Sequence, residues 1–450
     1  MKLLDQQQAG ADFLCDRGDA ACFDLMGAGK TLIAAQAYRQ MERDINEPLV
    51  VICPVIARQM WADVVGQHCG IAPRSIQIIR KGDEDVDPTA RMIVTSYGLT
   101  GVTRLARQLS DIPAAAIVLD ESSACKTHDS QRTRAVFGRK LDGSGHAIIA
   151  QSRNVWCLDG TPIRRWNDDL YPLIRALWSE RMGIKTLAEF RLRFCVMEQT
   201  YVGKRKVVKV AGSKNEDELN ALLYEGDEAV AIRRQIPVDM PDLTRRTIEV
   251  DLVATPALAA AVAEVTVGTD SHADAVARLI DHLESGDTAA ASLRRLVGIA
   301  KVPGVAQYLC DLIARRIQPV LCFAWHRDVL SQLALALIGL KMTVATIAGD
   351  TPERTRLGII DEFNAGRIDI LLGQTSALGV SANLQERCRH VVFAERDWSP
   401  AVEEQAIARV YRMGQTGHVQ VDTAHADNPI DEAVEVMLER KRGSHARAIG

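Results

Sequence analysis

Two series of short apolar runs constrain the fold most strongly. Segments with the spacing of amphipathic helices separate the runs, and each run ends in polar or turn-forming residues. This alternation is typical of parallel sheets whose strands are joined by crossover helices. It predicts two α/β lobes. The first series is PLVVICP (48–54), ARMIVTS (90–96), AAAIVLDE (114–121) and NVWCLDGTP (154–162). The second series is PVLCFAWH (319–326), MTVATIAGD (342–350), IDILLGQ (368–374) and HVVFAERD (390–397).

The segment between the two series lacks this strand rhythm. Within it, SHADAVARLIDHLE places Val276, Leu279, Ile280 and Leu283 on one face of a helix, which favours a structural helix packed on a lobe. A chain of 450 residues also exceeds what one hydrophobic core usually supports. The predicted organisation is a first lobe at 1–178, a helical and basic insertion with the inter-lobe linker at 179–295, and a second lobe at 296–450.

Cysteine usage and hydropathy predict a cellular compartment. The ten cysteines are scattered singly without a C-x-x-C pair, which favours reduced thiols over a disulfide frame or a zinc cluster. We expect no apolar run long enough to span a bilayer, and Asp5 comes too early for the core of a signal peptide. We therefore expect a cytoplasmic protein in a reducing compartment, with no membrane partner.

Charge is unevenly distributed along the chain. The formal net charge is −4, yet residues 180–214 contain nine Lys or Arg against three Glu, a net +6. Such a patch can neutralise nucleic-acid phosphates. A solvated surface loop explains it equally well.

The stretch FDLMGAGKT (23–31) resembles a phosphate-binding loop but departs from G-x-x-x-x-G-K-[ST], because Asp24 stands where a glycine is expected. Gly27 and Gly29 would let backbone N–H groups, including that of Ala28, approach phosphate oxygens. Lys30 would contact the β- and γ-phosphates of ATP, and Thr31 would bind Mg²⁺. The helix that follows would add its dipole.

The strand-like run AAAIVLDESS ends in two carboxylates about 90 residues after the loop. Asp120 would hold Mg²⁺ through water, and Glu121 would orient and deprotonate the attacking water. In the second lobe, QAIARVYRMGQ places Arg409 and Arg412 at i and i+3 of a predicted helix. Two arginines there could stabilise charge on the γ-phosphate.

With these motifs in order, the chain resembles the Swi/Snf family of superfamily 2 helicase-like ATPases, which move on DNA with two RecA-like lobes. The resemblance implies two RecA-like parallel-sheet lobes in tandem. QQAGADFL is similar to the family's Q-x-x-G-x-x-F-L and would make Gln7 the adenine-reading residue. DLMGAGKT matches D-x-M-G-x-G-K-T, in which Asp24 is the expected residue.

Further motifs extend the resemblance along the chain. VVICPVIARQMW resembles the next family motif, with Pro54 and Trp61 at the family's spacing, and Pro54 is assigned to the nucleic-acid site. VTSYGLT resembles the motif that in the family lies near the DNA backbone, which assigns Ser96 and Tyr97 to the same site. AIRR (231–234) resembles the segment leading out of the first lobe. In the second lobe, the resemblance assigns nucleic-acid contacts to Gly349, Gly379 and Asn383 and also aligns Arg356 and Phe363. CFAWH and VVFAERDWSP resemble the annealing-helicase, fork-remodelling branch.

Two departures from the family pattern lie in motifs that relay nucleotide state towards DNA. Ser123 replaces the histidine of D-E-x-H, and Asp159 replaces the threonine of L-T-G-T-P, where Gly160 and Thr161 follow. We hypothesise that Ser123 donates a hydrogen bond to Asp159. In the second lobe, Leu378 and Ser381 replace glycines of A-G-G-V-G-L.

The sequence therefore predicts an ATP- and Mg²⁺-dependent translocase on DNA, duplex or branched, that binds without sequence specificity and is targeted by DNA structure or a protein partner. A strand-unwinding helicase on DNA or RNA is one alternative. An ATP-gated nucleic-acid clamp that does not step is another.

Overall fold

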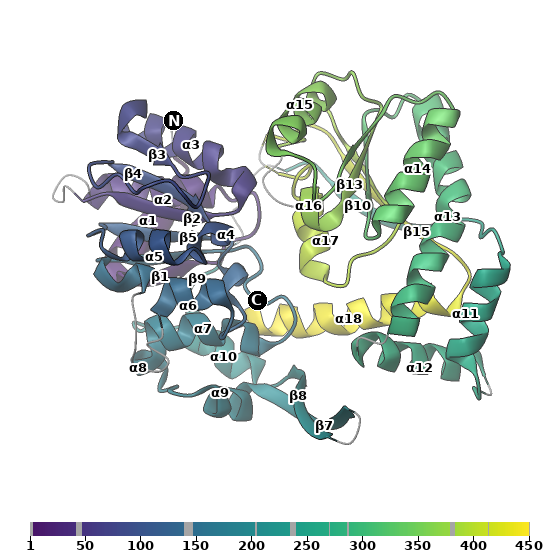
Figure 1. The fold of residues 1–450 in the computed structure, drawn as a ribbon, viewed down its shortest axis with the longest axis horizontal. Coiled ribbons are helices and arrows are strands. Elements are labelled where there is room, and N and C mark those ends of the chain that lie inside the picture. Colours follow the sequence, from purple (N-terminus) through teal and green to yellow (C-terminus); the bar gives the residue numbers. More distant parts are fainter. Residues whose placement is uncertain are drawn as a thin grey trace. The chain divides into compact units, whose positions relative to one another are not determined.

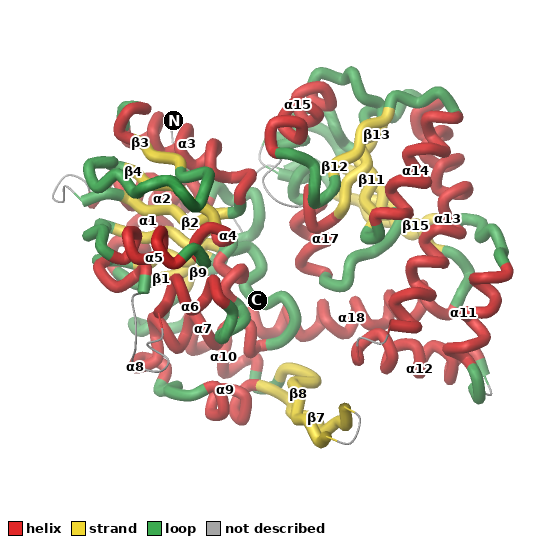
Figure 2. The backbone as a smooth tube through the Cα atoms, viewed as in Figure 1, coloured by secondary structure: helices red, strands yellow, loops and turns green. Residues whose placement is uncertain are grey.

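The computed structural model describes residues 3–41, 47–138, 147–202, 205–234, 240–269, 271–285, 288–378, 383–412 and 414–449. The chain forms two compact units, residues 1–237 with 443–450 and residues 238–442. Each unit contains a parallel sheet flanked by helices (Figures 1 and 2). The predicted pair of parallel α/β lobes is confirmed.

The first unit is built around a seven-stranded sheet with the strand order β3-β4-β2-β5-β6-β1-β9, in which every pairing is parallel. Its strands are β1 (Ala20–Cys22), β2 (Leu49–Cys53), β3 (Ile76–Ile78), β4 (Met92–Ser96), β5 (Ala116–Asp120), β6 (Val155–Leu158) and β9 (Ala231–Ile232). Its helices are α1 (Asp5–Arg17), α2 (Lys30–Met41), α3 (Arg58–Cys69), α4 (Tyr97–Thr100), α5 (Thr103–Ser110), α6 (Gln131–Phe137), α7 (Tyr171–Leu173), α8 (Ser179–Met182), α9 (Leu187–Phe194) and α10 (Glu216–Tyr224).

Both faces of this sheet are buried. In β2, Val50 and Ile52 join the core that includes α5, α6, α9 and α10, whereas Leu49 and Val51 join the core that includes α1, α2 and α3. Because successive side chains of a strand point to opposite faces, burial on both faces requires an uninterrupted apolar run. This is why the central strands were visible in the sequence.

The second unit contains a six-stranded parallel sheet with the order β10-β15-β14-β11-β13-β12. Its strands are β10 (Leu243–Glu249), β11 (Val320–Ala324), β12 (Val344–Ile347), β13 (Ile370–Gln374), β14 (His390–Phe393) and β15 (Val419–His425). Its helices are α11 (Pro256–Thr266), α12 (His272–Ser285), α13 (Thr288–Ala314), α14 (Arg327–Gly339), α15 (Glu353–Asn364), α16 (Thr375–Leu378), α17 (Pro400–Ile407) and the part of α18 (Pro429–Ile449) up to Arg442.

The predicted boundaries at 178 and 295 do not coincide with the two compact units. Residues up to 237 belong to the first unit, where β9 extends the sheet by pairing with β1 and a hairpin forms from β7 (Cys195–Val202) and β8 (Arg205–Ser213). From residue 238 onwards, β10 and α12 belong to the second unit. The segment predicted as one insertion is therefore divided between the units.

The predicted amphipathic helix is confirmed as α12. Val276, Leu279, Ile280 and Leu283 are all buried, and they pack in one core with residues of α11, α13 and α18. The sequence did not predict strands β1, β9 and β10, and each omission has a physical reason. β1 and β9 are too short to show a period, and β10 lies at the sheet edge with mostly exposed polar side chains.

Helix α13 corrects the expectation that no apolar run could match a bilayer. By length and composition alone, this helix of 27 residues could cross a membrane. In the second unit, however, its apolar residues form parts of two cores, one with α14 and the sheet and one with α12 and α18. Its burial is that of a core helix.

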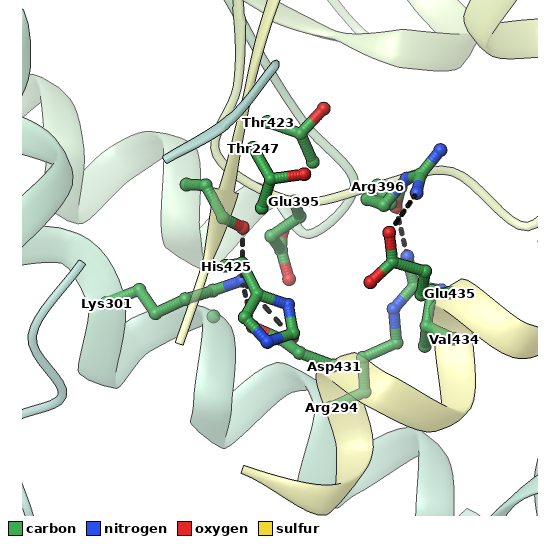
Figure 3. A pocket seen from close by; sticks show the side chains of 12 residues that line it. Thr247, Arg294, Lys301, Glu395, Arg396, Thr423, His425, Asp431, Val434 and Glu435 are labelled. Atoms are coloured by element: carbon green, nitrogen blue, oxygen red, sulfur yellow. Dashed lines mark hydrogen bonds and ion pairs between the residues drawn. The ribbon is translucent and has the colours of Figure 1, made fainter. Parts of the chain in front are cut away.

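A polar cluster joins α13 to the sheet and to α18 (Figure 3). Lys301 donates to Asp431 over 2.9 Å and to the carbonyl of Ala424 over 3.2 Å. Arg294 lies 4.1 Å from the Trp398 ring centroid and donates to the carbonyl of Arg396. The cavity among these side chains is about 20 Å³, room for about one water molecule. A nucleotide does not fit there, and the cluster serves packing.

Gly298 of α13 tests this close packing. A Cβ at Gly298 would lie 2.3 Å from Glu395 Oε1 and 2.9 Å from Val329 Cγ2. Gly298→Ala should therefore lower the free energy of unfolding by about 1–3 kcal/mol, although alanine favours helices by about 1 kcal/mol. Gly358→Ala, in α15 with no atom within 4 Å, should instead stabilise by up to about 1 kcal/mol.

Urea unfolding followed by circular dichroism compares the two variants with wild type. If both alanine variants were stabilised equally, the Glu395 side chain would have moved away from residue 298 without lowering the free energy of unfolding, which would contradict the prediction.

Candidate functional site

The loop after β1 has the backbone expected of a phosphate site. Gly27 and Gly29 have φ values of 82° and 79°, in the left-handed region that glycine adopts without steric cost. A Cβ at Gly29 would lie 2.5 Å from Gln7 Nε2. Helix α2 begins at Lys30, so its first N–H groups point towards the loop and favour an anion.

Gln7 supports this loop from α1. Its side-chain amide donates to the carbonyl of Ala28 over 3.1 Å, and its carbonyl accepts from the N–H of Leu4 over 3.1 Å. The residue is buried, with 3% of its surface exposed. Adenine recognition by Gln7 stays a prediction, and the structure adds a bracing role.

Asp24 replaces a loop glycine with a buried carboxylate. Arg234 pairs with it, with 2.6 Å between Nη2 and Oδ2, and the N–H of Arg234 donates to Oδ1 over 2.8 Å. The neighbouring Arg233 donates to the carbonyls of Phe23 and Gly160 over 2.8 and 3.1 Å. The AIRR segment therefore anchors the phosphate loop, a role that no local sequence signal reveals.

Asp120 and Glu121 lie at the carboxyl end of β5, as predicted. The indole N–H of Trp61 donates to Asp120 Oδ2 over 2.8 Å. Burial first, and the adjacent Glu121 carboxylate second, raise the pKa of Asp120 to about 7, while Trp61 and Lys30 oppose the rise. A divalent cation would offset this buried negative charge, so Asp120 fits the predicted Mg²⁺ site together with Thr31.

Lys30 lies within the same loop. Its ammonium donates to the carbonyls of Asp24 and Leu25 over 2.8 and 3.2 Å. Its positive charge opposes the rise in the pKa of Asp120.

The residues that follow β6, Asp159, Gly160 and Thr161, lie against the phosphate loop. The Asp159 N–H donates to the carbonyl of Cys22 over 3.2 Å. A Cβ at Gly160 would lie 2.6 Å from Met26 Cγ, so the loop and this motif are in close contact. Asp159 is fully buried and caps its own turn, because Oδ1 accepts from the Thr161 N–H over 2.8 Å.

Ser123 donates a hydrogen bond to Asp159, as hypothesised, and it does so through the backbone. The backbone N–H of Ser123 donates to Asp159 Oδ2 over 2.8 Å. The Ser123 hydroxyl instead accepts from Nε of Arg164 over 2.9 Å, because that guanidinium lies between the two strand ends. Sequence reasoning missed Arg164 entirely.

The predicted helix carrying Arg409 and Arg412 is wrong at its C-terminal end. Helix α17 ends at Ile407, and both arginines lie in the turns that follow. Nε of Arg409 donates to the Gln405 carbonyl over 3.1 Å, which satisfies a helix-end acceptor. Arg412 donates to Oδ1 of Asn383, so the structure does bring two of the predicted second-unit residues together.

The predicted DNA-contacting side chains have different environments. Ser96 and Tyr97 are 2% and 6% exposed, and Tyr97 packs in the first core, so contact with a DNA backbone through these side chains is not supported. Ser96 is the last residue of the buried strand β4 and Tyr97 follows it directly, which explains why both are buried. Gly349 is exposed, Pro54 is half-buried, and Gly379 lies outside the described residues.

The model for the SNF2-related domain matches residues 7–233, half of the chain. The model for the helicase conserved C-terminal domain matches residues 304–414. The chain belongs to the SNF2 family of helicase-like ATPases. The first match covers the phosphate loop, the paired carboxylates and Arg164, and the second covers Arg409 and Arg412.

The chain is similar to several curated proteins. It is 28% identical to the "DNA annealing helicase and endonuclease ZRANB3" of Mus musculus, over 98% of this chain and 40% of that protein. It is 27% identical to the "SWI/SNF-related matrix-associated actin-dependent regulator of chromatin subfamily A-like protein 1" of Xenopus tropicalis, over 98% of this chain and 44% of that protein. The chain thus spans less than half the length of these relatives.

One solved structure is also similar. The "Sulfolobus solfataricus SWI2/SNF2 ATPase core in complex with dsDNA" aligns with 98% of this chain and 92% of its own, at a TM-score of 0.45 and 20% identity.

The buried Asp24–Arg234 pair generates a stability prediction. Asp24→Asn should lower the free energy of unfolding by about 3 kcal/mol, because it leaves a partly buried guanidinium without its counter-charge. Glu47→Gln is the matched control. It removes a salt bridge to Arg153, whose side chain is 57% exposed, and should cost less than about 1 kcal/mol.

Both variants are compared with wild type by urea unfolding followed by tryptophan fluorescence. Equal effects of the two substitutions would contradict a structural role for Asp24.

Proposed function

We propose that the chain is an ATP-driven motor that moves along duplex DNA without reading its sequence. The observation that supports this most is the assembly of the phosphate loop, the carboxylate pair and the Asp159 turn at one edge of the first sheet, inside an SNF2-related match. Loop, carboxylates and turn are the parts that nucleoside triphosphate hydrolysis needs.

In the proposed reaction, backbone N–H groups of the Gly27–Thr31 loop and the start of α2 bind the phosphates, and Lys30 adds a positive charge. Glu121 orients the attacking water and accepts its proton. Mg²⁺, when bound with the nucleotide, would be held by Thr31 and Asp120 and would neutralise phosphate charge. Arg409 and Arg412 are proposed to stabilise charge on the γ-phosphate.

DNA as the partner is inferred from the relatives' names. They include DNA annealing helicases and the "Putative ATP-dependent helicase/translocase YwqA" of Bacillus subtilis, 24% identical to this chain. The basic composition of residues 180–214 suits phosphate contacts. Contacts to the phosphate backbone carry no sequence information, so we infer binding that is independent of sequence.

The first test is ATP hydrolysis measured without nucleic acid and with duplex DNA, single-stranded DNA, branched DNA and RNA. Duplex or branched DNA should stimulate wild type. Lys30→Ala should reduce kcat at least about 100-fold, because it removes a charge aimed at the transferred phosphoryl group. Lys81→Ala, at an exposed lysine of the same unit, should retain wild-type activity.

Absence of stimulation by every nucleic acid would refute the motor. Glu121→Gln should abolish turnover while fluorescent ATP analogues still bind, which separates the water-activating role from nucleotide binding.

Stepping generates a separate prediction. With saturating ATP, the protein should displace the third strand of a triplex, whereas a clamp that does not step should leave it bound. Unwinding of a forked duplex would favour the helicase alternative. Because phosphate contacts release counterions, raising salt from 50 to 200 mM should weaken DNA binding by at least about tenfold, with similar slopes for unrelated sequences.

A further inference from the structure

Arg164 is a cation in direct contact with the proposed general base, Glu121. Its Nη2 lies 2.9 Å from Glu121 Oε2, and the Arg164 side chain is only 13% exposed. Glu121 itself has a φ of 54°, a left-handed conformation that a non-glycine residue adopts when its surroundings hold it there. The carboxylate of Glu121 is thus held through both its backbone and its side chain.

The same guanidinium contacts Ser123 and Asp159, the two first-unit residues identified above as departures from the family pattern. Nε donates to the Ser123 hydroxyl over 2.9 Å, and Nη2 lies 3.5 Å from Asp159 Oδ1. A guanidinium presents Nε and Nη2 as a planar fork, so one side chain can satisfy two acceptors in a fixed geometry. In this structure Nε donates to Ser123 and Nη2 donates to Glu121.

Ser123 and Asp159 are suited to hold this fork. The hydroxyl of Ser123 can accept a hydrogen bond, and the carboxylate of Asp159 adds negative charge in a buried setting. The Asp159 carboxylate also accepts a hydrogen bond from the backbone N–H of Ser123, which holds Ser123 in place. Ser123 lies in the turn after β5, whereas Asp159 and Arg164 lie in the loop after β6, so the three residues connect two neighbouring strand ends.

We propose that Arg164 is the positioning residue for Glu121, and that Ser123 and Asp159 hold Arg164 in place. This inference rests on the proposed function, since it requires Glu121 to act on the water that attacks ATP. It also gives the departures at Ser123 and Asp159 one common role. Arg164 does not itself touch the nucleotide in this proposal.

Arg165 offers a matched control beside Arg164. Its side chain is exposed, and its backbone N–H donates to Asp169 Oδ2 over 2.7 Å. Arg165→Met therefore removes the same charge from the same loop without removing a contact to Glu121.

The test compares Arg164→Met, Arg164→Lys and Arg165→Met in duplex-stimulated ATPase assays. Arg164→Met should lower kcat about 30-fold while KM for ATP changes less than about threefold, because a general base misplaced by about 1 Å loses rate rather than nucleotide affinity. Arg164→Lys should recover part of the loss, since a lysine restores the charge but not the fork. Arg165→Met should behave as wild type.

Binding of a fluorescent ATP analogue and the melting temperature are measured for each variant. Both should stay close to wild type in Arg164→Lys and in any folded Arg164→Met protein. A rise in kcat on removing Arg164 would overturn the proposal, because it would mean that the contact restrains Glu121. A loss of nucleotide binding equal to the loss of kcat would also overturn it.

A double-mutant cycle tests the role of Ser123. Ser123→Ala alone should lower kcat about threefold, and adding it to Arg164→Met should cause no further loss, because Ser123 acts only through Arg164. If the kcat losses of the two single variants multiplied in the double variant, Ser123 would act independently of Arg164, which would overturn its proposed role. If Arg164→Met does not fold, Ser123→Ala and Arg164→Lys still carry the test.

Failure of the proposed function is recognised independently. An inactive wild type, or a Glu121→Gln variant that retains turnover, would refute the hydrolytic assignment itself. An active wild type with an inactive Glu121→Gln variant and an unaffected Arg164→Met variant would refute only the role of Arg164.

Discussion

The parallel register of β5, β6 and β1 is the constraint on which the candidate site depends. Asp120 lies opposite Leu158 of β6, and Leu158 lies opposite Cys22 of β1. The residues that follow these positions must therefore leave the sheet at the same edge. A slip of one residue would turn the side chains of a strand to the other face and separate the carboxylates from the phosphate loop.

Arginines then organise the charge that this edge concentrates. Arg234 pairs with Asp24 at the base of the loop, and Arg164 pairs with Glu121. Arg233 instead binds two carbonyls, so it connects the loop to the Asp159 turn through neutral groups. Burying several carboxylates side by side is unfavourable unless positive charge and hydrogen bonds accompany them, and these side chains supply both.

The sequence predicted most of what depends on local periodicity. β2, β4, β5 and β6 were expected from their apolar runs, as were β11 to β14. Most of these strands are buried on both faces, which leaves a continuous apolar signal, whereas β12 is a half-buried edge strand. Gly27 and Gly29 of the phosphate loop were expected from a local motif in the sequence, and both have positive φ. By contrast, β1 is three residues long, and α17 ends earlier than the spacing of Arg409 and Arg412 suggested.

The sequence by itself determined the two parallel α/β units, the family and the order of the motifs, because strand burial and glycine-rich loops leave local patterns in the chain. Only the tertiary structure decided which atoms meet. In the folded protein the Ser123 hydroxyl accepts a hydrogen bond from Arg164, and the Trp61 indole donates one to Asp120. Tyr97 is buried. These contacts join residues 41 and 59 positions apart, and no local period records which side chains the strand register will bring together.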